Sequence, residues 1–428
     1  MMRPSTAGLA AAFLLGFGFQ AVAADVSVPG LAQPGFCRGS DGAANRFGGR
    51  RTFRWDPAGL EYAKSHLADQ AIAPAYKTLM ARADTALAGP TYTVVDKSRT
   101  PPSGDKHDYI SMGPYWWPDA SKPNGEPYIR RDGEFNPERA TNAFDVSDLD
   151  AMSSGVEALS LAYYFTDDPR YAAKAAELLR VWFLDPATRM NPNTKYAQGV
   201  PGRTTGRAEG VLDTYRLLRV IEGVGLLAPS KALSAADQKG LERWFADYVA
   251  WMQTDPNGRE EQAAANNHGI WFDYQLAGFA LFARQDAVAR KVVSEAGQRR
   301  IKPQVEPNGA LPLELQRTRA LHYSYFALEA LVGTAQFGRC VDLDLWRYQT
   351  ADGRGLRGAF TFLAPYLGRE ASFPYPELKP EDAAPEALPL FAAAALAYGD
   401  GTLDDEITAL AARYPTSQTH LLVTPVRP

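Results

Sequence analysis

The chain has little histidine, little cysteine and no excess of basic residues. Its 428 residues include 5 histidines and 2 cysteines, and these do not recur at the spacings typical of metal sites. Lys and Arg number 45 against 49 Asp and Glu, a net charge of −4, which argues against a nucleic-acid binder that relies on overall positive charge. The sequence also lacks a Gly-x-Ser-x-Gly elbow, a P-loop and a dinucleotide-binding motif. We therefore expect chemistry that needs no metal and no other cofactor.

The bulk composition is that of a folded protein rich in aromatic side chains. Hydrophobic residues make up 46% of the chain and charged residues 22%, which excludes a disordered, collagen-like or coiled-coil protein. Aromatic residues reach 11%, with 20 Tyr and 8 Trp, and this suits a large aromatic core or rings that stack against a flat ligand. The length predicts two domains or one large repetitive domain.

The N-terminus has the features of an export signal. Arg3 precedes an apolar run over residues 9–19 that is short for a membrane span, and Ala21-Val22-Ala23 is a small-x-small cleavage pattern. We predict a signal peptide over residues 1–23 and, in a bacterium, a periplasmic or secreted protein without membrane contact after cleavage. In that oxidising compartment Cys37 and Cys340 either form a disulfide or remain buried thiols, and the sequence leaves both alternatives open.

Apolar residues spaced near 3.6 predict pairs of helices along most of the chain. No short motif recurs from pair to pair, which favours a closed ring of helix pairs over an open solenoid. We predict an all-α fold, an incomplete α/α toroid of about six to seven hairpins, in one domain over residues 24–428 with an N-terminal arm over residues 24–52. The expected helices cover residues 60–67, 72–87, 149–164, 171–184, 211–227, 234–252, 268–283, 287–301, 319–337, 355–367, 387–397 and 403–413.

Two long irregular stretches, over residues 91–142 and 189–206, interrupt this pattern, and loops of that length are usually functional. In the first, Tyr115, Trp116 and Trp117 stand between prolines and are followed by Arg130 and Arg131. Flat rings hold sugar faces, and guanidinium groups bind carboxylates through two hydrogen bonds. We predict a lid-like loop region over residues 91–142 that contacts substrate. The alternative is a loop that its own aromatic residues pin to the rim of the barrel.

Gln198 and Arg207 belong to the second stretch and its end. They offer neutral and charged donors for hydroxyls and carboxylates, and their alternative role is hydrogen bonding within the loop. Further along, Asn266 and Asn267 precede an expected helix, as ordinary N-cap residues do. They also place a side-chain amide next to His268 in a first helical turn.

The last cluster runs from residue 314 to residue 324. Arg319 and Tyr323 are four residues apart, so on a helix their side chains share a face. A neighbouring guanidinium favours the phenolate, and we therefore expect a lowered pKa at Tyr323 and a usable proton shuttle. The alternative is an amphipathic helix that buries Tyr323 in the core.

Four of these segments, in the same order, resemble the alginate lyase superfamily of α/α-barrel polysaccharide lyases. They are residues 109–119, residues 128–133, Asn266-Asn267-His268 and the Arg-Ala-Leu-His-Tyr run ending at Tyr323. The resemblance covers most of the mature chain, and the first two segments look more like polysaccharide lyase family 38 than family 5. It implies metal-independent β-elimination on an anionic uronic-acid polymer, alginate or glucuronan, with a 4,5-unsaturated uronate at the new non-reducing end.

Such an elimination needs donors for the uronate carboxylate, a base for C5 and an acid for O4. By matching position, the resemblance assigns Asn267 and an Arg to the carboxylate. It makes Tyr323 the base, the acid or both, and His268 the alternative base or the group that keeps Tyr323 poised. In family 5 the Arg precedes the Tyr by seven residues, where this chain has Gln316, so Arg317 is the preferred candidate and Arg319 the alternative. The expected substrate-binding residues are Tyr109, Tyr115, Trp116, Trp117, Arg130, Gln198, Arg207, Asn266, Trp271, Arg319 and His322.

Two other functions fit parts of the sequence. An inverting glycoside hydrolase needs two carboxylates on either side of a sugar, and acidic residues near loops are Asp145, Asp148, Glu209 and Glu314. A non-catalytic uronan-binding protein would keep the aromatic loop without turnover. The sequence does not distinguish mannuronate, guluronate and glucuronate, because subsite geometry alone separates these sugars.

Overall fold

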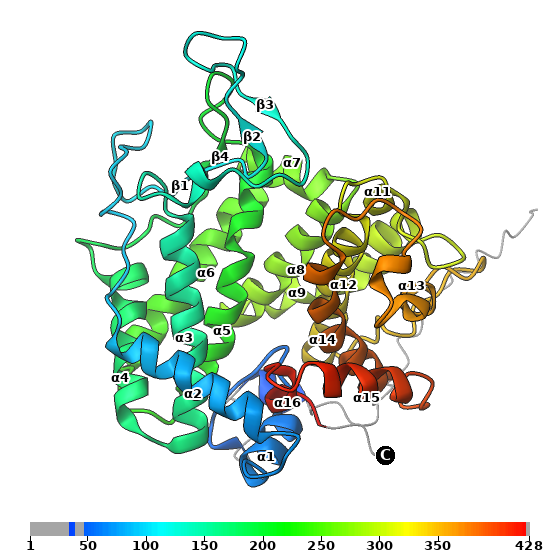
Figure 1. The fold of residues 1–428 in the computed structure, drawn as a ribbon. Helices are drawn as coiled ribbons and strands as arrows, with labels where there is room; N and C mark the ends of the chain where they lie inside the picture. Colours follow the sequence, from blue (N-terminus) through cyan, green and yellow to red (C-terminus); the bar gives the residue numbers. More distant parts are fainter. Residues whose placement is uncertain (1–33, 39–46, 425–428) are drawn as a thin grey trace, which may run out of the picture.

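The computed structural model describes residues 34–38 and 47–424 as a mainly helical toroid, as the sequence predicts (Figure 1). The expected signal peptide lies outside the described residues. The α-helices are α1 (Pro57–Ser65), α2 (Ala73–Ala88), α3 (Val146–Thr166), α4 (Pro169–Leu179), α5 (Leu217–Leu226), α6 (Ala235–Thr254), α7 (Pro256–Ala263), α8 (Asn267–Phe282), α9 (Asp286–Ala296), α10 (Lys302–Gln304), α11 (Pro312–Leu315), α12 (Ala320–Val341), α13 (Leu356–Leu363), α14 (Pro380–Tyr398), α15 (Asp404–Arg413) and α16 (Thr419–Leu422). Short 3₁₀ or π segments are η1 (Pro34–Cys37), η4 (Pro137–Ala140), η5 (Arg180–Leu184), η6 (Ala208–Arg216), η7 (Gly297–Ile301), η8 (Ala364–Tyr366) and η9 (Glu370–Ser372).

The inner layer of the toroid consists of α3, α5, α8, α12 and α14. Each of these helices packs on the next in that order, and α16 and α2 connect α14 back to α3. All five line one interior cavity of about 450 Å³. Outer helices α4, α6, α9 and α15 pack behind them. Inner helices are therefore buried almost all round, and in α8 every residue except His268 is buried. Among the described helices, none combines the length and the hydropathy needed to cross a membrane.

Capping residues explain where several helices begin. Asp168 accepts a hydrogen bond from the Arg170 amide, with Pro169 at the first position of α4. Hydrophobic periodicity does not predict α7, because this helix has few apolar residues. The local signal for α7 is Asp255, which caps it, followed by Pro256 at its first position.

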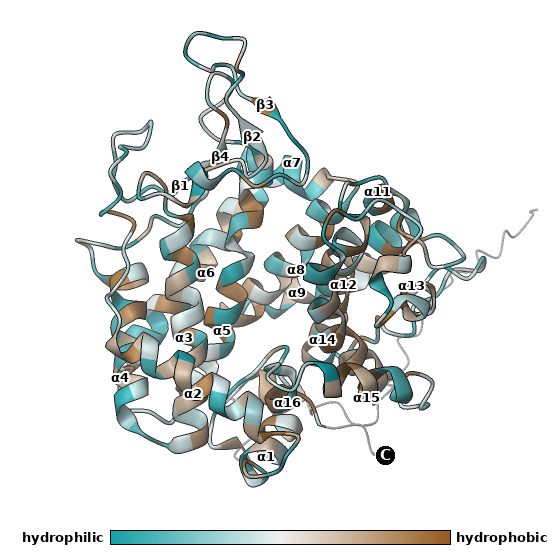
Figure 2. Ribbon diagram, viewed as in Figure 1, coloured by the Kyte–Doolittle hydropathy of each residue, from teal (hydrophilic) through white to brown (hydrophobic). Residues whose placement is uncertain are grey.

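The two irregular stretches meet at one end of the toroid and form a loop cluster, which we define as residues 91–142 and 189–206. Strand β1 (Ile110–Met112) from the first stretch pairs in parallel with β4 (Tyr196–Gly199) from the second. Strands β2 (Trp116–Trp117) and β3 (Ile129–Arg130) pair antiparallel, with Trp116 opposite Arg130. The cluster projects from the helices in Figure 1, and Figure 2 shows it mainly hydrophilic, whereas hydrophobic colour concentrates on the helices.

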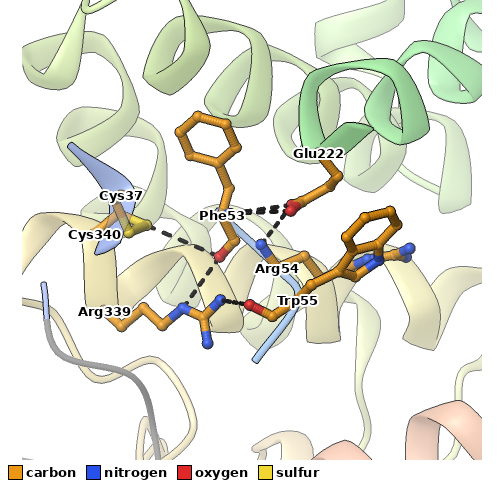
Figure 3. Close-up of a disulfide and its surroundings, with 7 residues drawn as sticks. All are labelled: Cys37, Phe53, Arg54, Trp55, Glu222, Arg339 and Cys340. Carbon is orange, nitrogen blue, oxygen red and sulfur yellow. Dashed lines mark hydrogen bonds between the residues drawn. A yellow bond between two sulfur atoms is a disulfide. The ribbon is translucent and has the colours of Figure 1, made fainter. Parts of the chain in front are cut away.

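Cys37 and Cys340 form a disulfide, so the pairing alternative is correct. The bond joins η1 to the last turn of α12 across 303 positions. Beside it, the backbone from residue 53 to residue 55 is held on both sides (Figure 3). Glu222 accepts hydrogen bonds from the amides of residues 53 and 54, and Arg339 donates to the carbonyls of residues 53 and 55. Residues 53–55 are thereby attached to α5 and α12, and Cys37 to α12.

We expect replacement of both cysteines by serine to lower the free energy of unfolding by about 2–5 kcal/mol, because the unfolded chain then loses a long-range constraint. Guanidinium chloride denaturation measures the difference, and reductant added to the unmodified protein should reproduce it. The folded variant should keep the structure of the loop cluster, because α12 begins beside that cluster and carries Cys340 at its other end. Equal denaturation midpoints with and without the disulfide would contradict this expectation.

Candidate active site

Helices α8 and α12 bring the two helical clusters named from the sequence to the same end of the toroid. Asn267 and His268 lie in the first turn of α8, and Tyr323 lies in the first turn of α12. These two helices pack against each other. Both begin at the end that carries the loop cluster (Figure 1).

Tyr323 is the point where helices and loop cluster meet. Its side chain is buried, and its hydroxyl oxygen lies 2.6 Å from that of Tyr115 in the loop cluster. The guanidinium carbon of Arg317 lies 3.6 Å from the centre of the Tyr323 ring. Arg317 also donates two hydrogen bonds to Asp132, of 3.1 and 2.7 Å. Burial would raise the pKa of Asp132, but Arg317 and Arg130 hold it at about 2, so Asp132 is ionised and fixes the guanidinium.

The expected lowering of the Tyr323 pKa is wrong. Burial raises the pKa of Tyr323 and the neighbouring Tyr115 raises it further, while Arg317 lowers it, and the net shift is upward. Desolvation disfavours the phenolate more than one guanidinium favours it, because that guanidinium is already paired with Asp132. Tyr323 therefore rests as the neutral phenol.

Arg319 does not lie beside the Tyr323 ring as the spacing suggests. Helix α12 begins at Ala320, and Arg319 is its non-helical N-cap with φ −126° and ψ 61°. The rule that residues four apart share a helical face does not apply there. The Arg319 guanidinium instead lies 3.6 Å from carboxylates of Glu377 and Asp382. Of the two candidate guanidinium groups, the structure therefore places only that of Arg317 on Tyr323.

Asn267 is held by a carboxylate of α11. Its backbone amide and its Nδ2 each donate to Glu314 at 2.7 Å, and both residues are buried. Asn267 Oδ1 is buried and accepts no hydrogen bond from any residue that the structure describes. The Arg317 amide donates to the Glu314 carbonyl at 3.1 Å. Glu314 therefore connects the start of α8 with the segment that carries Arg317.

His268 is half-buried and has its own carboxylate partner. Its Nδ1 lies 2.6 Å from Oε1 of the buried Glu261 in α7. Burial lowers the pKa of His268, but the carboxylates of Glu261 and Glu209 raise it, and the net shift is upward. Arg207 and Glu209, which form an ion pair at 2.6 Å, also act on this imidazole.

Trp116 and Trp117 of the loop cluster are half-buried and have arginines close to their rings. The Trp116 ring has the guanidinium carbons of Arg203 and Arg207 at 5.2 and 5.9 Å from its centre. Arg131 lies 5.3 Å from the centre of the Trp117 ring. Arg130 is 55% exposed and pairs with Asp132. Rings and guanidinium groups thus alternate on this part of the loop cluster.

Tyr109 and Gln198 depart from the expectation that they bind substrate. Tyr109 is fully buried, and its hydroxyl donates to Asp213. Gln198 is also buried, donates through Nε2 to Asp213 and accepts from Arg207. Their polar groups are used inside the protein, so both hold the loop cluster together and neither faces a sugar. Hydrogen bonding within the loop was the alternative role considered for Gln198 and Arg207. Arg207 uses part of its donors in this way, because it donates to the backbone carbonyl and the side-chain oxygen of Gln198.

The remaining expected binding residues lie around the inner helices. Asn266 is the N-cap of α8 and accepts from the His268 amide at 3.2 Å. Trp271 is buried between the rings of Tyr215 and Phe326 and lines the interior cavity. His322 binds Glu386 of α14 at 2.8 Å. Asn266 and Trp271 therefore extend from the start of α8 into the toroid.

Sequence patterns missed three residues at this end. Glu261 has no local signal, because its role depends on how α7 packs against α8. Asp132 lies in a segment named for its arginines, and its two hydrogen bonds to Arg317 span 185 positions. Phe135 is 59% exposed, and its ring centre lies 6.3 Å from that of Tyr115. The signal that could have identified Phe135 is a phenylalanine in a loop rich in aromatic residues.

Three of the four acidic residues considered for a hydrolase are occupied by protein partners, and Asp148 is the exception. Asp145 is buried and paired with Lys97, Glu314 is buried and bound to Asn267, and Glu209 is paired with Arg207. This arrangement does not supply the two facing carboxylates that an inverting hydrolase needs. Within residues 34–38 and 47–424, no group of three or more His, Cys, Asp or Glu is placed to hold a metal ion.

Comparisons with known proteins show the family and the fold of this chain. A family model described as Alginate lyase matches residues 93–373. An alginate lyase from Bacteroides ovatus is 39% identical, with 88% of this chain and 99% of that chain covered and a TM-score of 0.83. Alginate lyase A1-III from Sphingomonas species A1 is 14% identical, with coverages of 82% and 95% and a TM-score of 0.51, and shares the fold. The search of curated proteins found no match. The chain therefore belongs to the alginate lyase family and is a polysaccharide lyase.

Proposed function

We propose that this lyase cleaves alginate, or alternatively glucuronan, by β-elimination at the site formed by Asn267, His268, Arg317 and Tyr323. The observation that carries the proposal is the contact of Arg317 and Tyr115 with Tyr323 at the end of the toroid where α8 presents His268. Family membership supports the same chemistry, since the relative from Bacteroides ovatus is described as an alginate lyase.

Neutralisation of the uronate carboxylate is the first requirement, because the C5 proton is poorly acidic beside a negative charge. Arg317 uses Nε and one terminal nitrogen on Asp132, which leaves the other terminal nitrogen for a substrate carboxylate. Asn267 retains one Nδ2 hydrogen after its bond to Glu314. A charged and a neutral donor are therefore available for the carboxylate.

Proton transfer is assigned from the resting state of Tyr323 and from the ring nitrogen that His268 has free in its neutral form. Tyr323 is a neutral phenol, which suits donation to the departing O4. The phenolate that donation produces would be stabilised by Arg317, whose guanidinium lies over the Tyr323 ring. His268 then serves as the base for C5 through Nε2, because Nδ1 is bound to Glu261. The alternative is a syn elimination, in which Tyr323 both takes the C5 proton and donates to O4. It would apply to a uronate with the opposite configuration at C5.

Sugar binding is assigned to the exposed side of the loop cluster. Trp116, Trp117 and Phe135 offer ring faces or edges, and Arg130 offers a largely exposed cation for an anionic polymer. Such a surface would bind sugar units on either side of the cleaved bond.

Export of the protein fits this substrate. A polysaccharide is cleaved where the cell meets it, and the Cys37–Cys340 disulfide suits an oxidising compartment. We therefore propose that residues 24–428 form one exported lyase domain in the periplasm or outside the cell.

Ultraviolet absorbance of the new C4–C5 double bond tests the function. Purified protein is mixed separately with mannuronate-rich alginate, guluronate-rich alginate and glucuronan, and reducing ends are measured in parallel. We expect absorbance and reducing ends to rise together on at least one polymer. Reducing ends without absorbance would identify a hydrolase, and binding without either product would identify a non-catalytic protein.

A further inference from the structure

The neighbours of His268 are arranged so that one ring nitrogen is used by the protein. His268 is the one residue of α8 that is not buried, whereas its partner Glu261 is 1% exposed. The Nδ1 to Oε1 distance of 2.6 Å is that of a strong, charge-assisted hydrogen bond. Glu261 lies on α7, a separate helix that packs against α8, so its carboxylate reaches His268 from a different helix.

We propose that Glu261 is a positioning residue for the elimination: it holds Nδ1 of His268 and leaves Nε2 as the ring nitrogen available to the sugar. The inference rests on the proposed function, because it gives His268 a defined proton-transfer atom in that reaction. A carboxylate on one imidazole nitrogen fixes both the ring orientation and the tautomer. Glu261 itself does not touch the substrate in this proposal.

Other charged groups also face His268. Glu209 and Arg207 approach from η6, and Glu314 of α11 interacts with it through space. Glu209 and Arg207 pair with each other at 2.6 Å and shift the pKa of the imidazole in opposite directions. Glu261 is the residue among these that is hydrogen-bonded to the imidazole.

The substitution Glu261→Gln separates charge from geometry. Glutamine keeps an oxygen that accepts from Nδ1–H but removes the negative charge that favours the imidazolium. We expect the pKa of His268 to fall by about one unit. The limb of the pH–kcat profile that belongs to His268 should move to lower pH by the same amount. The shift to lower pH is expected whether His268 acts as base or as acid. His268 sets the acidic limb in the first case and the alkaline limb in the second, and either limb moves with the pKa of the imidazole.

The experiment combines NMR titration of the His268 ring, assigned with His268→Gln, with pH profiles of kcat and KM. Glu261→Ala should lose about 100-fold in kcat with little change in KM, and Glu261→Gln should recover much of this at its own optimum. Glu370→Gln is the matched control, since Glu370 is buried and paired with Arg413 away from the site. It should change neither readout.

Two results would overturn the inference. One is an unchanged His268 pKa in Glu261→Gln; the other is a lowered pKa with an unmoved pH–kcat profile. The titration needs no substrate, so it reports on Glu261 and His268 even if no uronan is cleaved. Should Glu261→Ala not fold, Glu261→Gln carries the test alone.

Discussion

Tyr323→Phe should lower kcat on the preferred uronan by at least about 10³-fold while the fold stays intact. The substitution removes one hydroxyl, which is the proposed proton donor to O4, and leaves the ring under the Arg317 guanidinium. The upward-shifted pKa of Tyr323 keeps this donor protonated across the neutral range. Ultraviolet absorbance measures the rate, and circular dichroism and thermal unfolding check the fold.

Tyr325→Phe is the matched control for that experiment. Tyr325 lies two residues further along α12, is 1% exposed, and its hydroxyl makes no hydrogen bond with any residue that the structure describes. Its loss should leave kcat close to that of the unmodified protein. If Tyr323→Phe kept a tenth or more of kcat, the acid would have to be another group, and Tyr115 would be the next to replace because its hydroxyl lies 2.6 Å away.

Arg317→Ala should lower kcat/KM by about 10²- to 10³-fold, the range observed when one preorganised donor to a developing charge is removed. The variant loses both the donor to the uronate carboxylate and the cation over the Tyr323 ring. Arg317→Lys should recover part of the loss, because a lysine keeps the charge but not the two hydrogen bonds to Asp132. Initial rates over a range of substrate concentrations give kcat and KM separately.

Arg319→Ala tests the competing assignment of the carboxylate donor. Arg319 pairs with Glu377 and Asp382, so its loss should affect stability more than turnover. A drop in kcat/KM for Arg319→Ala as large as that for Arg317→Ala would reverse the assignment. Thermal unfolding of both variants separates a catalytic loss from a structural one.

Most of the helices could be predicted from the sequence, because the spacing of apolar residues directly reflects which side of each helix is buried in the toroid. Helices α2, α3, α6 and α8 begin and end within a few residues of their predicted bounds. Capping residues such as Asp168 and Asn266 act locally and mark helix starts without knowledge of the fold. Helix α7 shows the limit of this approach, since a polar helix carries no apolar period.

The candidate site was accessible only in part, because its geometry depends on contacts between distant segments. The asparagine, histidine and tyrosine were identified as residue types, but their carboxylate partners were not assigned. Glu314 binds Asn267 across 47 positions, and Asp132 binds Arg317 across 185. The four-residue spacing between Arg319 and Tyr323 wrongly predicted that their side chains share a helical face. Helix α12 begins at Ala320, so Arg319 lies outside it. Desolvation, which sets the sign of the Tyr323 pKa, cannot be read from spacing at all.

The 303-position span between the paired cysteines also constrains when the disulfide can form during synthesis of the chain. Cys37 belongs to an early part of the chain, whereas Cys340 lies in the last turn of the helix that begins beside Tyr323. The native pair therefore cannot form until nearly four fifths of the polypeptide has been synthesised. The disulfide therefore forms only once the helix that carries Tyr323 has been made, and a chain that ends before that helix has neither.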